Sequence, residues 1–468
     1  MHRCPIARSG RRPAPAARIG RGVCALAFTL LTGCATYHTL PLPAGDGARS
    51  VGQLSAPLPQ RAWLPAHHFD PADGLDVTEL ATLAVANNPD LRSRRDALGV
   101  ARAQAFAAGL LPDPQLGLGA DFPRSHAADL TTAYSASISA DLGALLARST
   151  RVAAAHSQAQ QVNLDLLWAE WQTVAQARLL FDQVTTLQAR QLRLQHERDA
   201  LAPLAAQVQA ALRAGNLTHD AASAGLNALA DVRHRLDATA VALHQAEADL
   251  HGLLGLAPDA PIELVGPPWQ ADPSPASVQH ALDALPQRRP DLLALQAGYA
   301  AQEASLRGAI RAQFPAINLG FNTARDTSAV YTNGVTLGIT LPLFDRNRGN
   351  IAIATATRQQ LRDDYAARVL ATRTDIRRLT ADLATLAPAA AAQERHAREL
   401  AQARRAAEAG WRHGELDWPT YLTIRANALA ADLDRLDIDQ QRATASIALG
   451  ALLGSTDLTH ASARADTP

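Results

Sequence analysis

The sequence of 468 residues contains no lysine, so all 44 of its lysine-or-arginine positions are arginines. A Walker-type phosphate loop needs a Gly-Lys-Ser/Thr triplet, and a Schiff-base enzyme needs a side-chain amine. Gly-x-Ser-x-Gly and Cys-x-x-Cys motifs are also missing, and His196-Glu197 has no second histidine four residues after the first. We therefore expect a protein that is not an enzyme and that needs no cofactor.

Cysteines, aromatics and long apolar runs are scarce as well. The three cysteines, Cys4, Cys24 and Cys34, all lie near the start, which leaves the rest of the chain without a disulfide or a thiolate metal site. Aromatic residues make up 4%, which favours long helices over a compact aromatic core. Beyond Cys34 no stretch approaches about 18 uninterrupted apolar residues, so any membrane crossing would require strands in a closed barrel.

The first 33 residues have the pattern of an export signal. They hold six arginines and no acidic residue, followed by the apolar run Val23 to Leu31 and by Leu31-Thr32-Gly33-Cys34. This ending resembles a bacterial lipoprotein box, in which Cys34 would become the first mature residue and carry the lipid. Ala35 then implies export to the outer membrane. The alternative is an ordinary signal peptide that contains a cysteine by chance.

Removing six of the 44 basic residues with the signal leaves 38 against 44 acidic ones. The mature chain is mildly acidic, so we expect no nucleic-acid partner. Residues 34–75 are interpreted as a lipid-anchored N-terminal segment.

The remaining sequence contains an internal repeat. Residues 227–237 read NALADVRHRLD and residues 427–437 read NALAADLDRLD, an offset of 200. Further matches in the same order are Asn88-Pro89-Asp90-Leu91 with Arg289-Pro290-Asp291-Leu292, Leu111-Pro112 with Phe314-Pro315, Gly215-Asn216-Leu217 with Gly414-Glu415-Leu416, and Leu253-Leu254-Gly255 with Leu452-Leu453-Gly454. We predict a first repeat at 76–265, a Pro-rich linker at 266–284, a second repeat at 285–456 and a tail at 457–468.

Long helices are predicted in both repeats. A first helix runs from about Val77 to Gly109 and is stopped by Pro112 and Pro114. Long helices follow at 146–256 and 345–454. Leu146 to Arg213 and Asp345 to Arg412 contain one proline each, Pro203 and Pro388, and would each be roughly 100 Å long if wholly helical. Such lengths indicate coiled-coil packing, unless the helices are broken around an ordinary bundle.

Four strands are predicted at about 115–122, 132–142, 316–323 and 333–343. Apolar side chains alternate along them with small or polar ones, as in transmembrane barrel strands and equally in a half-buried soluble hairpin. Under the barrel interpretation the lipid-facing residues are Leu116, Leu118, Phe122, Ile138, Ile317, Leu319, Phe321, Val335, Leu337, Ile339 and Leu341. Four strands cannot close a barrel, so copies would share one: about eight strands in a dimer or about twelve in a trimer.

Taken together, these motifs resemble the TolC family of outer-membrane efflux proteins over roughly residues 76–456. The repeated Asn/Arg-Pro-Asp-Leu openings, the Leu/Phe-Pro breaks, Leu341-Pro342-Leu343-Phe344 and the Leu-Leu-Gly endings carry the resemblance. It implies a mainly α protein with four β-strands per chain, long coiled-coil helices forming an α-barrel, and a shared trimeric 12-stranded transmembrane β-barrel. It also implies a homotrimeric exit duct among outer-membrane lipids. An inner-membrane efflux pump and a periplasmic adaptor protein would feed it with metal ions, drugs or other small molecules.

In that family the turns between the long helices lie at the periplasmic tip, where they meet the adaptor. By this resemblance the tip residues are Gly215, Asn216, Leu217, Thr218, Asp220, Gly414, Glu415, Leu416 and Asp417. Family members can carry aperture-narrowing aspartates after the second turn, where this chain has Pro419 and Thr420. The resemblance therefore does not establish an acidic ring at that place.

Two other functions remain open. A structural lipoprotein that spans the periplasm without a pore would share the coiled coils but would not need alternating strands. A metal-binding or enzymatic lipoprotein would need a polar cluster, and His67, His68 and Asp70 are the nearest approach to one. These three residues lie in an irregular Pro-rich stretch, so we assign no metal site.

Overall fold

The computed structural model describes residues 36–42, 49–124, 130–268 and 273–454, except 55–73. The predicted signal peptide, Cys34, the candidate ligands His67, His68 and Asp70, and the tail at 457–468 lie outside the described residues. The chain divides into two units, residues 1–47 and 48–468. Of the first unit, residues 36–42 are described, and they form neither helix nor strand.

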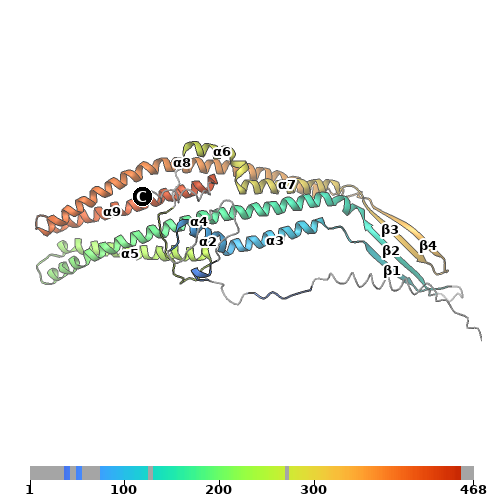
Figure 1. The fold of residues 1–468 in the computed structure, drawn as a ribbon, viewed down its shortest axis with the longest axis horizontal. Helices are drawn as coiled ribbons and strands as arrows, with labels where there is room; N and C mark the ends of the chain where they lie inside the picture. Colours follow the sequence, from blue (N-terminus) through green and yellow to red (C-terminus); the bar gives the residue numbers. More distant parts are fainter. Residues whose placement is uncertain (1–35, 43–48, 55–73, 125–129, 269–272, 455–468) are drawn as a thin grey trace, which may run out of the picture. The chain divides into compact units, whose positions relative to one another are not determined.

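The described elements of the second unit come in one order that occurs twice, as Figure 1 shows by colour along the chain. After a short 3-10 helix, η1 (Val51–Gln53), the first series is α2 (Val77–Asn87), α3 (Pro89–Gly109), β1 (Gln115–Asp121), β2 (Ala133–Asp141), α4 (Leu142–Arg213) and α5 (His219–Leu254). The second is α6 (Pro275–Arg288), α7 (Pro290–Arg311), β3 (Ala316–Arg325), β4 (Tyr331–Thr340), α8 (Arg348–Arg412) and α9 (Trp418–Leu453).

Two predicted boundaries differ from the structure, both because of proline. The helix predicted at 77–109 is broken before Pro89, because a proline disfavours helical geometry in the residue that precedes it. Asn88 has ψ 125° there, and its side chain accepts a hydrogen bond from the Leu91 N–H at 2.9 Å, which starts α3. The segment predicted as a linker at 266–284 contains most of α6. Pro275 occupies the first turn of that helix, where proline is tolerated, and Ser274 caps it.

The long helices continue through their internal prolines, and α4 starts directly after its strand. Pro203 lies inside α4, which has 72 residues, and Pro388 lies inside α8, which has 65. Asp141 ends β2 and also caps α4, since its side chain accepts from the Ala144 N–H at 3.0 Å. Strand and long helix are therefore joined directly.

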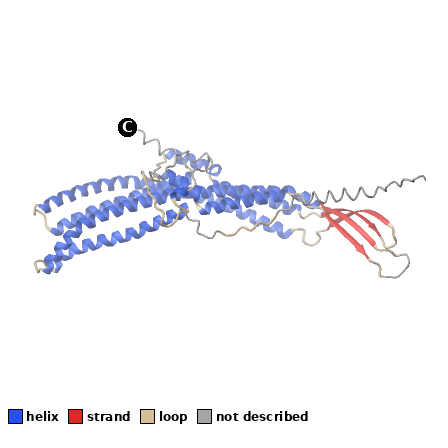
Figure 2. Cartoon of the chain, turned by 60° about the horizontal axis from the view of Figure 1, so that its bottom comes forward, coloured by secondary structure: helices blue, strands red, loops and turns tan. Residues whose placement is uncertain are grey.

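The four strands form one antiparallel sheet in the order β1-β2-β3-β4, beyond one end of the long helices (Figure 2). Register pairs Leu116 with Ile138, Ile138 with Phe321, and Phe321 with Val335. Directly paired residues lie on the same face of a sheet, so these apolar side chains form one row across all four strands.

The core lies between helices rather than in the sheet. Leu80, Phe181 and Leu254 belong to a cluster that joins α2, α4 and α5, and Leu285, Leu292 and Ile376 to one that joins α6, α7 and α8. In the long helices α4 contacts both α5 and α9, and α9 contacts α8 (Figure 1). Across the described part of the chain, no helix combines the length and apolarity that crossing a bilayer requires.

Candidate channel-forming surfaces

One face of the sheet is apolar and open. Of the eleven predicted lipid-facing residues, Ile317 is half-buried and the other ten are exposed, from 43% for Leu319 to 76% for Leu118. A second row on this face pairs Leu319 with Leu337, and a third pairs Ile317 with Ile339. Phe122 and Leu341 lie one residue beyond β1 and β4. Isolated chains rarely expose so large a continuous apolar surface unless something covers it.

The opposite face is small and polar. Its rows pair Gly117 with Ser137 and Ser137 with Asn322, and further along Gly320 with Thr336. A Cβ added at Gly117 would come within 2.7 Å of the Ser137 hydroxyl, so a larger residue at this position would force the Ser137 side chain to move. The two faces differ in chemistry although both are open to solvent in a single chain.

Both outer strands of the sheet have a free side. In the described sheet β1 pairs with β2 alone and β4 with β3 alone, so each leaves a row of backbone N–H and C=O groups without a strand partner. The antiparallel order also makes β1 and β4 run in opposite directions. The free side of β4 in one copy therefore matches that of β1 in another for antiparallel pairing.

The two turns between the long helices have the same construction. Gly215 and Gly414 adopt φ of +75° and +76°, a region that residues with a Cβ rarely adopt. At the first turn the Asn216 N–H bonds to the Ala211 carbonyl at 2.9 Å and the Gly215 N–H to Leu212 at 3.1 Å. At the second, Glu415 bonds to Gly410 at 2.8 Å and Gly414 to Trp411 at 3.0 Å. This is the Schellman pattern, which ends a helix and reverses the chain.

After the turns, the next helices start on polar residues. Asp417 accepts from the Thr420 N–H at 2.8 Å, and hydrogen bonds from the Thr420 side chain and backbone lower the pKa of that carboxyl. Asp220 lies in the first turn of α5. Leu217 and Leu416 are half-buried, while Gly215, Asn216, Thr218, Gly414 and Glu415 are exposed. The predicted tip residues therefore occupy two turns and the helix starts that follow them.

An aromatic cluster packs beside the second turn. Trp411 and Tyr421 stack with ring centroids 5.1 Å apart, and Trp418 lies 5.9 Å from Trp411. Trp418 also packs on Gly225 of α5, where an added Cβ would lie 2.9 Å from the indole ring. The cluster thus connects the α8–α9 hairpin with the α4–α5 hairpin.

A buried ion pair lies on the same connection. The Arg425 guanidinium on α9 donates to both carboxylate oxygens of Glu197 on α4, at 2.8 and 2.7 Å, and to the Tyr421 hydroxyl at 2.8 Å. The hydrogen bonds and charge of Glu197 outweigh the effect of burial and raise the pKa of Arg425. Bidentate geometry in a buried place makes this a strong contact.

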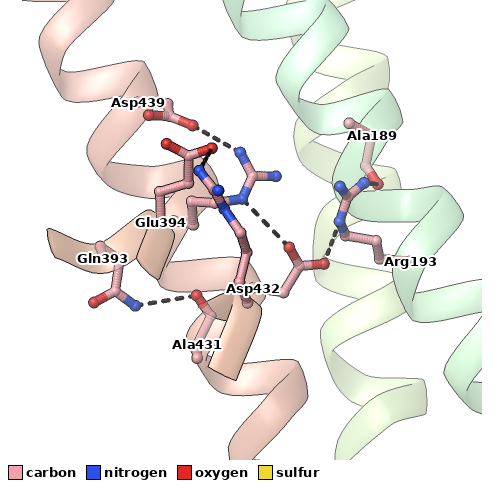
Figure 3. Close-up of polar contacts among 9 residues, drawn as sticks. Ala189, Arg193, Gln393, Glu394, Ala431, Asp432 and Asp439 are labelled. Carbon is pink, nitrogen blue, oxygen red and sulfur yellow. Dashed lines mark hydrogen bonds and ion pairs between the residues drawn. The ribbon is translucent and has the colours of Figure 1, made fainter. Parts of the chain in front are cut away.

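Further ion pairs between α4 and α9 follow on one side of Glu197–Arg425, toward lower residue numbers on α4 and higher ones on α9. Asp432 of α9 pairs with Arg193 of α4, and Arg435 pairs with Asp432 and Asp439 on its own helix (Figure 3). Arg190 pairs with Asp437 at 2.5 Å. Several of these side chains line an open groove between α4, α8 and α9. The α4–α9 pairs could not be predicted from the sequence, because partners 228 or more residues apart leave no local signal.

No metal site is evident within the described ranges, where no group of three or more His, Cys, Asp or Glu side chains could hold an ion. The described residues thus present two candidate surfaces. One is the amphipathic open sheet at one end of the helices, and the other is formed by the two charged, capped turns at the opposite end.

Comparison with known proteins identifies the class. Residues 281–455, nearly the whole of the second predicted repeat, match the family described as Outer membrane efflux protein. The resemblance expected from the sequence is confirmed.

Similar proteins include protein CyaE and two outer-membrane channels of known structure. Protein CyaE of Bordetella pertussis is 28% identical over 403 residues, covering 77% of this chain and 80% of CyaE. The open-state MtrE outer membrane channel of Neisseria gonorrhoeae has TM-score 0.67 at 19% identity, over 90% of this chain and 97% of that one. The CmeC outer membrane channel of Campylobacter jejuni has TM-score 0.70 at 15% identity, over 90% and 95%. At these identities the two channel structures show that this chain shares their fold.

Proposed function

We propose that this chain is a subunit of an outer-membrane exit duct of an efflux system, in which small molecules or metal ions pass passively to the exterior. The observation that carries the proposal is the four-stranded sheet, with an apolar face, a small polar face and two free edges. The family match of residues 281–455 and the channel fold support it.

The proposed duct needs several copies of the chain. In lipid every backbone polar group requires a partner, so the free edges of β1 and β4 must pair with neighbouring copies until the sheet closes. Three copies would give about twelve strands with the apolar rows facing lipid and the Gly/Ser/Asn rows facing water. We therefore propose a homotrimer with a shared barrel, built from two repeats per chain.

The helices would then extend into the periplasm. In this arrangement the turns at Gly215 and Gly414 form the tip that meets a periplasmic adaptor and an inner-membrane pump. Lipid on Cys34, after removal of residues 1–33, would anchor residues 34–75 to the outer membrane. The exposed turns and the hairpin contacts through Arg425 and Glu197 are compatible with a tip that is held together by polar contacts.

A pair of arginine substitutions on adjacent strand positions tests the proposed lipid face. Leu337 belongs to an apolar row and Thr336 to the polar row beside Gly320. Leu337→Arg should abolish the stable oligomer in outer-membrane fractions, because an arginine facing the bilayer midplane costs about 2–4 kcal/mol in each copy. Thr336→Arg, with the same residue on the water-facing side, should assemble normally. Normal yields of Leu337→Arg oligomer would contradict the proposal.

A further inference from the structure

The ends of α3 and α7 and the starts of α4 and α8 lie where the sheet begins (Figure 1), and several arginines belong to these stretches of the sequence. The Arg148 Nε of α4 donates to the Gly109 carbonyl at the end of α3, at 2.8 Å. Asn347, before α8, donates to the Ala309 carbonyl at the end of α7, also at 2.8 Å. These contacts bring the ends of α3 and α7 against the starts of α4 and α8. We call this region the junction collar: residues 106–113, 141–151, 307–316 and 341–351.

Five arginines of the junction collar form no hydrogen bond or ion pair with a charged group among the described residues. Arg151 donates to the Ala108 carbonyl at 3.2 Å, Arg311 to the Ser149 hydroxyl at 2.9 Å, and Arg348 to the Phe344 carbonyl at 3.1 Å. Arg148 and Arg346 complete the set. No ion pair between described residues includes any of the five, in contrast to the arginines of the α4–α9 interface.

The carboxylates nearby do not balance this charge. The collar contains three, Asp113, Asp141 and Asp345, against these five arginines and Arg307. Asp141 is engaged as the cap of α4, where its carboxylate accepts from the Ala144 N–H. A cationic surface with free guanidinium donors is left.

Apolar side chains stand beside these arginines. Phe344 is 89% exposed, and the other exposed large apolar residues of the collar are Phe106, Leu110, Leu111, Leu145, Leu146, Ile310, Phe314, Leu341 and Leu343. Val335, Leu337, Ile339, Leu341 and Leu343 follow one another at two-residue spacing, so the apolar series of β4 runs on into the collar. The collar is therefore continuous with the proposed lipid face and adds positive charge at its border.

We propose that the junction collar binds anionic phospholipids of the periplasmic leaflet, with arginines on the phosphates and Phe344, Leu343 and Leu111 among the acyl chains. Guanidinium groups match phosphate oxygens in geometry, and apolar residues beside basic ones are the pattern of an interfacial membrane anchor. The inference rests on the proposed function, since it needs the sheet to lie in a membrane. It adds a lipid headgroup as ligand and the collar arginines as its site.

The test compares two double variants of the full-length protein by native mass spectrometry with dioctanoyl phosphatidylglycerol. Arg311→Gln/Arg346→Gln removes two collar charges. The control, Arg362→Gln/Arg373→Gln, removes two exposed α8 arginines that are outside the collar and form no ion pair with a described residue. We expect the collar variant to bind this lipid roughly 10- to 30-fold more weakly, since each basic residue near an anionic surface contributes about a factor of five. The control should bind as the wild type does.

Three results would overturn the proposal. These are equal lipid affinity of the two variants, equal binding of dioctanoyl phosphatidylcholine, or loss of the phosphatidylglycerol complex in the presence of millimolar inorganic phosphate, which would indicate a site for free anions. Pore formation by both variants and by the wild type separates this failure from failure of the proposed duct. If none of the three forms a pore, even when Glu197→Gln is added to weaken the contact between the hairpins, the duct itself is wrong.

Discussion

Asp182 on α4 is an ionisable residue that is 4% exposed, and its charge interacts with that of Asp439 on α9. Burial, with a contribution from Asp439, raises the pKa of Asp182 from its ordinary 3.8 to about 6. The folded chain therefore holds this proton more tightly than the unfolded chain. Stability should fall as pH rises from about 4 to about 6 and stay reduced above that range.

Asp182→Asn removes this ionisation and should raise stability at pH 7 to 8. The expected gain is at most about 3 kcal/mol, at about 1.4 kcal/mol per pKa unit, and it should vanish below pH 4. Thermal unfolding across this pH range measures it, with Asp249→Asn at an exposed position of α5 as control. A gain that is the same at every pH would mean that the ionisation of Asp182 is not its cause.

Asp291, from the second Pro-Asp-Leu motif, has the opposite pH dependence. Its carboxylate accepts from Arg289 at 2.9 and 2.7 Å and from Arg368 at 2.8 Å, and Arg289 also stacks on Trp168 at 4.6 Å. Burial alone would raise the pKa of Asp291, but hydrogen bonds and charges from the two arginines lower it. Its contribution to stability is present above the ordinary pKa of 3.8 and is lost as pH falls through the lowered value.

Asp291→Asn should lower stability at pH 7 by about 3–5 kcal/mol, because it leaves Arg289, which is 2% exposed, buried without its counter-charge. Arg368→Gln removes the more exposed partner and should cost less. Chemical denaturation at pH 7 compares the two. An equal loss in both variants would show that the buried Arg289 contact is not the dominant one.

At the scale of elements, sequence periodicity correctly predicted the features that depend on local sequence patterns. The strands begin and end within three residues of the predicted limits, since alternation and flanking turns are local properties. The break at Asn88–Pro89 and the helix at Pro275–Arg288 were missed, because proline was weighed only as a helix stop or linker residue and not as the first residue of a helix. The role of each strand face is still a prediction.

The two long-helix turns share one conformational requirement, positive φ at Gly215 and Gly414. Alanine at either position should cost about 1–2 kcal/mol, because its Cβ clashes in the left-handed region. Gly252 lies inside α5, and a Cβ there would meet nothing within 4 Å. Gly252→Ala should therefore stabilise the chain by about 0.5–1 kcal/mol. Hydrogen exchange near the turns and thermal unfolding would test both signs; stabilisation by Gly215→Ala or Gly414→Ala would contradict the turn geometry.

At the scale of the whole molecule, the sequence could not predict how the two hairpins meet. Glu197 with Arg425, Arg193 with Asp432, and Trp418 with Gly225 join residues that lie far apart in the chain. Charged and aromatic residues on long helices are too common for their pairing to be inferred from spacing. The structure supplies these contacts, and they give a specific way to loosen the connection between the hairpins. Glu197→Gln weakens the bidentate pair without changing the size of the side chain.

Conductance of the purified protein in a planar lipid bilayer tests the proposed duct most directly. Discrete current steps are expected from the wild type, or from Glu197→Gln if contacts between the hairpins hold the tip closed. Insertion is verified separately by recovery of the protein with the bilayer lipids. A Glu197→Gln protein that inserts stably as an oligomer and passes no current would contradict a water-filled channel, and a structural lipoprotein without a pore would then explain the fold better.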